Sequence, residues 1–406
     1  MASKAATTAT TTVDTGALAP AVLDKHKSAA TVVDKALKEV ISLCAEGATI
    51  LELCKAGDAK VESEVDKVYN KKGTDKVSKG LAYPTCVSVN GVISNLSPLP
   101  SDKEQAGVVL KSGDLVKIQV GAHIDGYASI AGESLVIGGK DAILSDIKAD
   151  LIQAAYQASE IALRSARPGA KNWEITAGIS KILEEYKEKT KVRGIEGAST
   201  NANSFGWKMM KDDIQAKKTI TPFPTSEQRR DSDNTHSLEE GEVYCLMVAV
   251  TNADDPKAKD SSSHTTSIYC RLPTSYQLKM KASREVYSEI VRKAGAFPFP
   301  LRILENETRA KLAVRECVQH SLLKPFDVQV ISNNESDLVA SFTITFLLTK
   351  TGASRLSLPP TWYTAEKVKS SVEISNEETK ALLTKSLKPP KKKSEKKVKE
   401  GEEDKE

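Results

Sequence analysis

His123 and Asp125 are the residues of this 406-residue chain whose types and spacing first suggest chemistry. Residues two apart in a strand lie on the same face of the strand. Imidazole and carboxylate groups are common metal ligands, and a metal site would need further carboxylates nearby. Two interpretations are therefore open, a metal site and a pair of polar residues at the tip of a β-hairpin.

Motifs for nucleophilic or phosphate chemistry are absent from the sequence. It contains neither G-x-S-x-G nor G-x-x-x-x-G-K-[ST]. The six cysteines are scattered at positions 44, 54, 86, 245, 270 and 317, and none forms a C-x-x-C pair. We expect buried free thiols in a reducing, intracellular compartment, with a disulfide or zinc site as the alternative.

The first half of the chain contains the elements that must position these residues. Apolar residues recur at helical spacing from 32 to 44, and two shorter helices are predicted at 50–55 and 60–68. A strand at 83–92 is broken by Asn90-Gly91, which predicts a tight hairpin. A second strand pair, 115–121 and 126–137, is joined by Asp125-Gly126.

The second half repeats this order of helix pairs and strands. The predicted elements are helices at 143–155, 175–183, 276–294 and 308–323, and strands at 243–250, 328–332 and 338–348. Helix pairs and antiparallel strand pairs that occur twice predict an α+β domain with internal duplication, not alternating βαβ units. The segment 262–324 is almost wholly helical in this prediction and is interpreted as an insertion into the main domain.

Charge is unevenly distributed. Hydrophobic residues make up 40% of the chain, and its net charge is +4. The stretch 385–399 holds eight lysines and one glutamate, and the last seven residues hold five acids and one lysine. We predict a disordered basic-then-acidic tail at 385–406 and a disordered Ala/Thr-rich start at 1–20. No secretory signal or membrane span is predicted.

Three sequence blocks together resemble one family. They are Tyr83-Pro-Thr-Cys-Val-Ser-Val-Asn90 continuing to Asn95-Leu-Ser-Pro98, Ser112-Gly-Asp through Asp125-Gly126, and Glu242-Val-Tyr-Cys-Leu-Met247 with Leu338-Val-Ala-Ser-Phe through Leu348. Their order and spacing are similar to those of the type-two methionine aminopeptidases. The resemblance implies the α+β pita-bread (creatinase/methionine aminopeptidase) fold across 21–380, with the segment 262–324 as the family's helical insertion.

The resemblance also implies where a dinuclear metal site would lie. The family holds two metal ions with two Asp, one His and two Glu, and the ions activate a bridging water. The four carboxylate positions that align here are Gln119, Ile130, Met247 and Thr343. The ligand His would fall within 197–205, which contains no His, and the substrate-facing His position is Asn95. Since neutral groups cannot offset the charge of two dications, we expect no metal and no cofactor.

A narrower resemblance is to the catalytically inactive proliferation-associated protein family, which includes a fungal curved-DNA-binding protein. It rests on Lys257-Ala-Lys-Asp260, the stretch Leu278–Arg284, Pro325-Phe-Asp327 and the Lys-rich tail. This chain departs from that family at Gln119 and Ile130 and in an unusual insert at 205–218.

The narrower resemblance implies partners. They are the large ribosomal subunit near the peptide exit, and ribosomal RNA, with roles in ribosome biogenesis, subunit export and translation, and with nucleus, nucleolus and cytoplasm as locations. Lysines and arginines would bind RNA phosphates through counterion release. The candidate contacts are Lys71, Lys72, Lys76, Lys79, Lys257, Lys259, Lys279, Lys281, Arg284, Lys391, Lys392, Lys393, Lys396 and Lys397.

Three alternatives stay open. Each basic patch is also typical of an ordinary solvated surface. A nuclear protein that prefers curved DNA is the second functional candidate, and a residual metal-dependent aminopeptidase is the third. No membrane partner is expected.

Overall fold

The computed structural model describes residues 17–70, 77–138, 143–196, 206–332 and 334–387. Its helices are α1 (Pro20–Leu43), α2 (Ile50–Val65), α3 (Lys103–Ala106), α4 (Ile147–Ser165), α5 (Asn172–Lys189), α6 (Ser226–Arg230), α7 (Lys281–Ala294), α8 (Glu307–Gln319) and α9 (Glu377–Thr384), with 3-10 turns η1 (Ser232–Asn234) and η2 (Leu301–Ile303). Its strands are β1 (Lys79–Val89), β2 (Val92–Ser94), β3 (Leu115–Ile124), β4 (Tyr127–Val136), β5 (Arg193–Gly194), β6 (Gly206–Met210), β7 (Asp213–Thr219), β8 (Val243–Thr251), β9 (Lys259–Asp260), β10 (Ile268–Arg271), β11 (Phe299–Pro300), β12 (Leu323–Phe326), β13 (Gln329–Val330), β14 (Val339–Thr349) and β15 (Gly352–Arg355).

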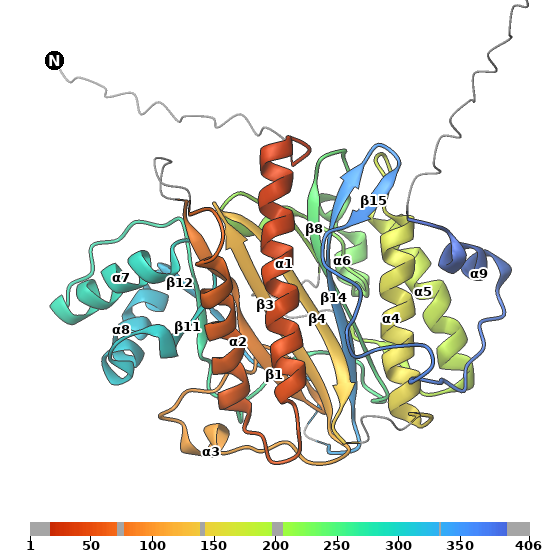
Figure 1. The fold of residues 1–406 in the computed structure, drawn as a ribbon, viewed down its shortest axis with the longest axis horizontal. Coiled ribbons are helices and arrows are strands. Elements are labelled where there is room, and N and C mark those ends of the chain that lie inside the picture. Colours follow the sequence, from red (N-terminus) through yellow and green to blue (C-terminus); the bar gives the residue numbers. More distant parts are fainter. Residues whose placement is uncertain (1–16, 71–76, 139–142, 197–205, 333, 388–406) are drawn as a thin grey trace, which may run out of the picture.

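One large antiparallel sheet organises the molecule (Figure 1). Its strand order is β1-β3-β4-β14-β8-β6-β7, with β15 paired to β14 and β5 paired to β8. The central pair β14 and β8 comes from strands that are about ninety residues apart in sequence, in register from Val339↔Thr251 to Leu347↔Val243. The sheet therefore joins the two halves of the chain.

Two helix pairs cover the same sheet at different strands. Helices α1 and α2 pack on the strands of the first half, and their apolar residues form one core cluster with Ile118 and Val120. Helices α4 and α5 lie over the second half, where α4 residues pack with Phe342 and Leu246. Figure 1 shows α1 and α2 over β1, β3 and β4, and α4 and α5 beyond β14. The predicted repetition of helix pair and strands is present in these two halves.

Helix α2 differs from the prediction of two short helices. It runs without a break from Ile50 to Val65, through Gly57. A Cβ at Gly57 would lie 2.4 Å from the Thr85 hydroxyl oxygen, so the glycine allows close contact between α2 and β1. Tertiary packing here outweighs the poor helix propensity of glycine, which is why the sequence pattern suggested a break.

The two predicted turns have different outcomes. Asp125 and Gly126 have φ of 53° and 81° and join β3 to β4, which confirms that hairpin. Asn90 also has a positive φ, 48°, but β2 pairs with β13 in a separate three-stranded sheet rather than with β1. The prediction of a hairpin at Asn90-Gly91 was therefore wrong in its pairing, because β13, more than two hundred residues later, pairs with β2 in place of β1.

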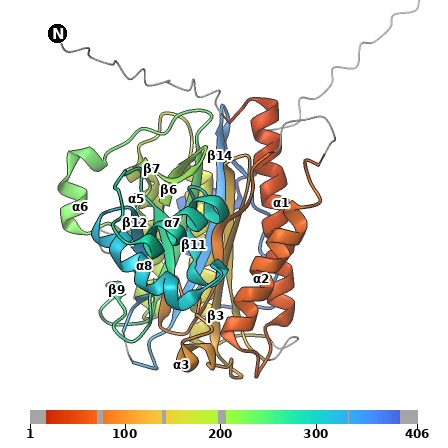
Figure 2. The same cartoon turned by 90° about the vertical axis from the view of Figure 1, so that its left-hand side faces the viewer.

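The segment 262–324 is less helical than expected. Helices α7 and α8 pack on each other, and strand β10 pairs with both β11 and β12 in a small sheet beside them. Figure 2 shows α7, α8, β11 and β12 on the side of the sheet away from α1 and α2. Of the unusual insert at 205–218, the described residues, 206–218, lie in the β6–β7 hairpin, which extends the large sheet beyond β8.

The cysteines agree with the prediction of free thiols. All six are free, and five of them are buried. Burial raises the pKa of the Cys54 thiol to about 11, so the group stays protonated at neutral pH. Within the part of the chain that the structure describes, no helix is long and apolar enough to cross a membrane.

A C-terminal strap, residues 356–387, returns across the helices and is held by carboxylates. Asp34 accepts from the Leu358 amide, and Glu133 accepts from the amides of Thr361 and Trp362. Further along, Asp150 accepts from Ser371 and Glu185 from Ser375. These four buried acids come from α1, β4, α4 and α5, so both helix pairs and the large sheet contribute to holding the strap.

The Asp34 carboxyl predicts a pH-dependent stability. Burial, reinforced by the nearby Glu133 charge, raises its pKa to about 6 from an ordinary value of 3.8. Because the pKa is higher in the folded protein than in the unfolded chain, the carboxyl group favours folding most below pH 3.8. This contribution to the free energy of unfolding is lost as the pH rises through 6. We expect Asp34→Asn to gain about 2 kcal/mol of stability relative to the unchanged protein between pH 4 and pH 7. Urea denaturation at several pH values in this range measures the free energy of unfolding of both proteins. A difference between them that does not change with pH would contradict the prediction.

Candidate functional site

The four aligned carboxylate positions lie close together on the sheet. Gln119 of β3 pairs with Gly132 of β4, Gly132 pairs with Thr343 of β14, and Thr343 pairs with Met247 of β8. Directly paired residues point to the same face of a sheet. Ile130 lies two residues before Gly132 and so shares this face. The structure therefore brings all four predicted positions into one patch.

This patch faces away from the helix pairs. The alternating neighbours Ile118, Phe342 and Leu246 belong to the two helix-covered cores. On the opposite face Ile130 packs with Tyr83 and Cys86, and Met247 packs in another small apolar cluster. Ile130, Met247 and Thr343 are buried, while Gln119 is half-buried. The patch is therefore made of packed, uncharged side chains, two apolar and two polar.

The residues present do not fit a dinuclear metal centre. Gln119 and Thr343 offer neutral oxygens, Ile130 offers no donor, and Met247 offers only a thioether. In the described ranges, no group of three or more His, Cys, Asp or Glu side chains is placed to hold a metal ion. The segment 197–205, where the ligand His was expected, lies outside the described residues. The aligned side chains cannot supply the negative charge that two dications require.

Asn95, at the position aligned with the substrate-facing His, connects two segments of the chain through its side-chain hydrogen bonds. Its side-chain oxygen accepts from the Tyr83 hydroxyl, and its amide donates to the Asp327 carbonyl at 2.8 Å. Its φ is 68°, a conformation that asparagine tolerates better than most residues. Asn95 is buried, and both ends of its amide have partners inside the protein. It therefore links β1 to the strand region that follows the insertion.

Replacing Asn95 by alanine should lower the free energy of unfolding by about 2 kcal/mol, because the buried Tyr83 hydroxyl loses its acceptor. Urea denaturation gives the value. Asn95→Gly is the matched control, since glycine removes the same hydrogen bonds but adopts φ of 68° without strain. A second variant, Tyr83→Phe, should make Asn95→Ala less costly. If Asn95→Ala lowered the free energy of unfolding equally with and without the Tyr83 hydroxyl, the hydrogen bond between Asn95 and Tyr83 would not contribute to stability.

His123 and Asp125 agree better with a hairpin-tip pair than with a metal site. The His123 ring is buried and stacks on Phe297 with centroids 4.2 Å apart. Burial lowers its pKa to about 4, although Asp125 opposes this. The Asp125 carboxylate is bound by Lys25 at 2.5 Å and Lys211 at 3.2 Å. Asp125 is thus used for ion pairs at the turn.

The candidate RNA-binding lysines have different surroundings. Lys257, Lys259 and Lys279 are exposed, and Lys259 pairs with Asp255 at 2.9 Å. Lys79 is half-buried and donates to the Val68 carbonyl and Asn70 side chain, both at 2.6 Å. The candidates outside the described residues are Lys71, Lys72, Lys76, Lys391, Lys392, Lys393, Lys396 and Lys397.

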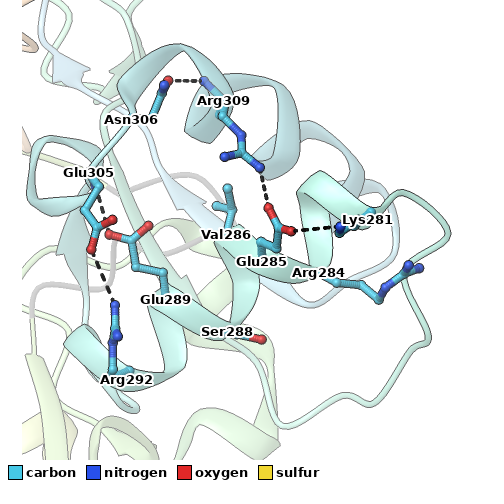
Figure 3. Close-up of a pocket in the computed structure, with 10 residues that line it drawn as sticks. All are labelled: Lys281, Arg284, Glu285, Val286, Ser288, Glu289, Arg292, Glu305, Asn306 and Arg309. Atoms are coloured by element: carbon cyan, nitrogen blue, oxygen red, sulfur yellow. Dashed lines mark hydrogen bonds and ion pairs between the residues drawn. The ribbon is translucent and has the colours of Figure 1, made fainter.

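The basic residues of α7 are largely matched by acids (Figure 3). Glu285 lies between Lys281, at 3.9 Å, and Arg309. Arg292 pairs with Glu305 at 3.5 Å. This groove of about 730 Å³ is lined by four basic and three acidic side chains. The sequence analysis singled out Lys281 and Arg284 and missed Glu285, which lies four residues after Lys281 on the same helix.

Arg284 is exposed, but its guanidinium group is engaged. Its Nη1 donates to the carbonyls of Leu278 and Lys279, both at 2.8 Å. These bonds hold the turn that leads into α7, where the first helical residue is Lys281. Among the α7 candidates, Lys279 and Lys281 are therefore better placed to contact a phosphate than Arg284, which keeps only part of its donor capacity.

Comparison with known proteins places this fold in a family. Metallopeptidase family M24 matches residues 24–262. The chain is 37% identical to the curved DNA-binding protein of Schizosaccharomyces pombe, covering 93% of each chain. It is 38% identical to ERBB-3 binding protein 1 of Solanum tuberosum, covering 83% of this chain and 81% of the relative. It is 32% identical to proliferation-associated protein A of Dictyostelium discoideum, covering 91% and 90%.

Solved structures agree with the sequence relatives. A thermophilic Arx1 superimposes with a TM-score of 0.80 at 30% identity, covering 91% of this chain and 99% of that one. Methionine aminopeptidase of Thermotoga maritima gives a TM-score of 0.51 at 17% identity over 84% and 98%, which supports the fold alone. The pita-bread α+β architecture is thereby confirmed. The chain belongs to metallopeptidase family M24, and within it to the proliferation-associated protein family that includes the curved DNA-binding protein and the ERBB-3 binding proteins.

Proposed function

We propose that this protein is a non-catalytic pita-bread scaffold that binds the large ribosomal subunit near its peptide exit and binds ribosomal RNA. It acts in ribosome biogenesis, subunit export and translation, in the nucleus, the nucleolus and the cytoplasm. It needs no cofactor. The observation that carries the proposal is the patch of Gln119, Ile130, Thr343 and Met247, where the aligned metal-ligand positions carry no acid.

Charge supplies the physical basis for RNA binding. The body of the protein is nearly neutral, while 385–399 carries a net charge of +7 from eight lysines and one glutamate. RNA phosphates attract such lysines, because binding releases condensed counterions. Double-stranded RNA is recognised by its shape and backbone, so lysines without aromatic stacking residues suit it. Exposed Lys257 and Lys279 offer further contacts on the folded body.

Sedimentation tests the proposal. In a sucrose gradient at low salt, the protein should travel with large ribosomal subunits, and at about 500 mM salt it should move to the top of the gradient, because phosphate contacts weaken steeply with salt. Small subunits loaded in parallel are the control. Protein that stays at the top of the gradient at low salt would overturn the proposal.

A second candidate is binding to curved DNA. It is favoured by one observation, the 37% identity to a protein named for that activity. Competition decides between the two functions: a labelled ribosomal RNA fragment is displaced by unlabelled curved DNA, straight DNA or the same RNA. We expect RNA to be the strongest competitor. Displacement by curved DNA at lower concentration than by RNA would favour the second candidate.

A residual metal-dependent aminopeptidase is the third candidate. We expect no turnover of a Met-peptide with added cobalt or manganese, because the aligned positions lack carboxylates to hold the ions. The assay compares the unchanged protein with Gln119→Ala. A metal-dependent rate that this substitution abolishes would show that the patch retains catalysis.

A further inference from the structure

We propose that Ser375 is a phosphorylation site for an acidophilic Ser/Thr protein kinase, and that its phosphorylation releases the end of the C-terminal strap from α5. Ser375 lies where the strap enters α9, in a hydrogen-bonded contact with α5. Release of the strap would change the surface of the protein independently of the ribosomal function.

Ser375 and Glu185 form this contact. The Ser375 amide and hydroxyl both donate to Glu185 Oε2, at 2.5 Å and 2.7 Å. The Asn376 amide donates to the same carboxylate at 3.4 Å. Glu185 belongs to α5 and is buried, whereas Ser375 is exposed. The Glu185 carboxylate thus binds the backbone of the two residues that precede α9.

The sequence around Ser375 suits a kinase with a basic peptide-binding site. Asn376 follows it, and Glu377 and Glu378 stand at the second and third positions after the serine. Both acids occupy the first turn of α9 and have exposed side chains, 85% and 75% respectively. Acidic side chains at these positions provide charge complementary to basic groups on an enzyme. Ser375 and its recognition determinants are therefore exposed residues of one short segment, although the serine hydroxyl itself is engaged with Glu185.

Phosphoryl transfer would convert the contact from attractive to repulsive. The Ser375 oxygen attacks the γ-phosphorus of ATP, the bond to the bridging oxygen breaks, ADP leaves, and the hydroxyl proton passes to a base of the kinase. The modified residue loses its hydroxyl donor and carries almost two negative charges. Although burial alone would raise the pKa of Glu185, the donors of Ser375 and Asn376 and the charge of Lys189 lower it, so the carboxylate is ionised. Two anions would then face each other at hydrogen-bond distance.

Nearby cations already have partners. Lys181 pairs with Glu378 at 2.9 Å, and Lys380 pairs with Glu377 at 2.8 Å. Lys189 donates to the carbonyl of Glu373. A phosphate at Ser375 would compete for them with existing acceptors. Beyond this point α9 is held by half-buried leucines, Leu382 and Leu383, and by Arg164, which donates to the Lys385 carbonyl at 3.0 Å.

The test uses the full chain, ATP and a purified acidophilic kinase. Mass spectrometry should locate phosphate on Ser375. Amide hydrogen exchange in 375–384 should then become at least about tenfold faster, the size expected from losing the Glu185 contact, while α4 keeps its protection. Trypsin cleavage after Lys380 and Lys385 should accelerate in parallel.

Ser237 supplies a matched control. It is exposed and has the same pattern, with Glu239 and Glu240 at the second and third positions after it, but it lies outside the strap. Ser237→Ala should leave the accelerated exchange unchanged, whereas Ser375→Ala should abolish it. Ser375→Glu should reproduce the release without kinase, while Ser375→Ala alone should stay near the unmodified protein.

Glu185→Gln separates repulsion from simple loss of a hydrogen bond. The amide oxygen still accepts from the strap but carries no charge, so phosphorylation of this variant should release the strap much less. Absence of phosphate on Ser375 would overturn the assignment of the site. Unchanged or increased protection in the phosphorylated protein would overturn the release, since it would mean that the phosphate stabilises the start of α9.

Discussion

Replacing Lys391, Lys392, Lys393, Lys396 and Lys397 together by glutamine should weaken binding to ribosomal RNA about a hundredfold at physiological salt. The five lysines lie within nine residues of sequence that also contain one acid, Glu395, and two prolines. Each phosphate contact contributes to the salt dependence of the affinity. The slope of log affinity against log salt should therefore fall by about 3 to 4. Fluorescence anisotropy with a labelled RNA fragment, titrated at several salt concentrations, measures both quantities.

A control variant distinguishes the effect of charge on RNA binding from the effect of residue type. Replacing the same five lysines by arginine keeps the charge, so it should keep both the affinity and the slope. Removing the acidic end, residues 400–406, should strengthen binding, because these residues carry a net charge of −4. If the glutamine variant bound RNA as tightly as the unchanged protein, the tail would not be the main RNA contact, and Lys257 and Lys279 would become the better candidates.

Arg302→Met should lower the free energy of unfolding by about 3–5 kcal/mol, because it leaves a buried carboxylate without its partner. Arg302 lies in η2 and forms an ion pair with Asp58 of α2, and their side chains are only 5% and 10% exposed. Its other nitrogen donates to Ser97 at 2.6 Å, and Asp58 also accepts from the Thr85 amide at 2.8 Å. One pair therefore connects the segment 262–324 with α2 and β1.

Urea denaturation measures this loss, and two variants control it. Arg309→Met removes an arginine whose side chain is 50% exposed, so it should cost less than about 1 kcal/mol. Adding Asp58→Asn to Arg302→Met removes the unpaired charge, so the double variant should be more stable than Arg302→Met alone. A double variant that is less stable would mean that Asp58 matters mainly for its bond to Thr85.

Local sequence signals predicted much of the fold because they are strong here. The apolar spacing of α1, α4 and α5 and the Asp125-Gly126 turn each identify an element without reference to the rest of the chain. The prediction was wrong where distant segments decide the outcome. Helix α2 continues through Gly57 because Thr85 packs against it, and β2 pairs with β13, more than two hundred residues later.

The candidate site, like the fold, could be predicted from the sequence only in part. The four positions Gln119, Ile130, Thr343 and Met247 could be aligned from sequence blocks, and the register brings them into one patch. The partners of charged side chains could not be predicted, because ion pairs depend on side-chain placement. Nothing in the sequence distinguishes Arg284, which binds two carbonyl oxygens, from Lys279, which is exposed.

The row that crosses β3, β4, β14 and β8 has a consequence for any attempt to build a metal site on this face. Gln119, Thr343 and Met247 lie on separate strands, and Ile130 and Met247 are packed in different apolar clusters. Placing a carboxylate at Ile130, Met247 or Thr343 would bury a charge before the other ligands existed to share a metal. Each such single substitution would lower the free energy of unfolding before a complete ligand set was present. A metal site on this face would therefore have to be introduced at several positions together, not one residue at a time.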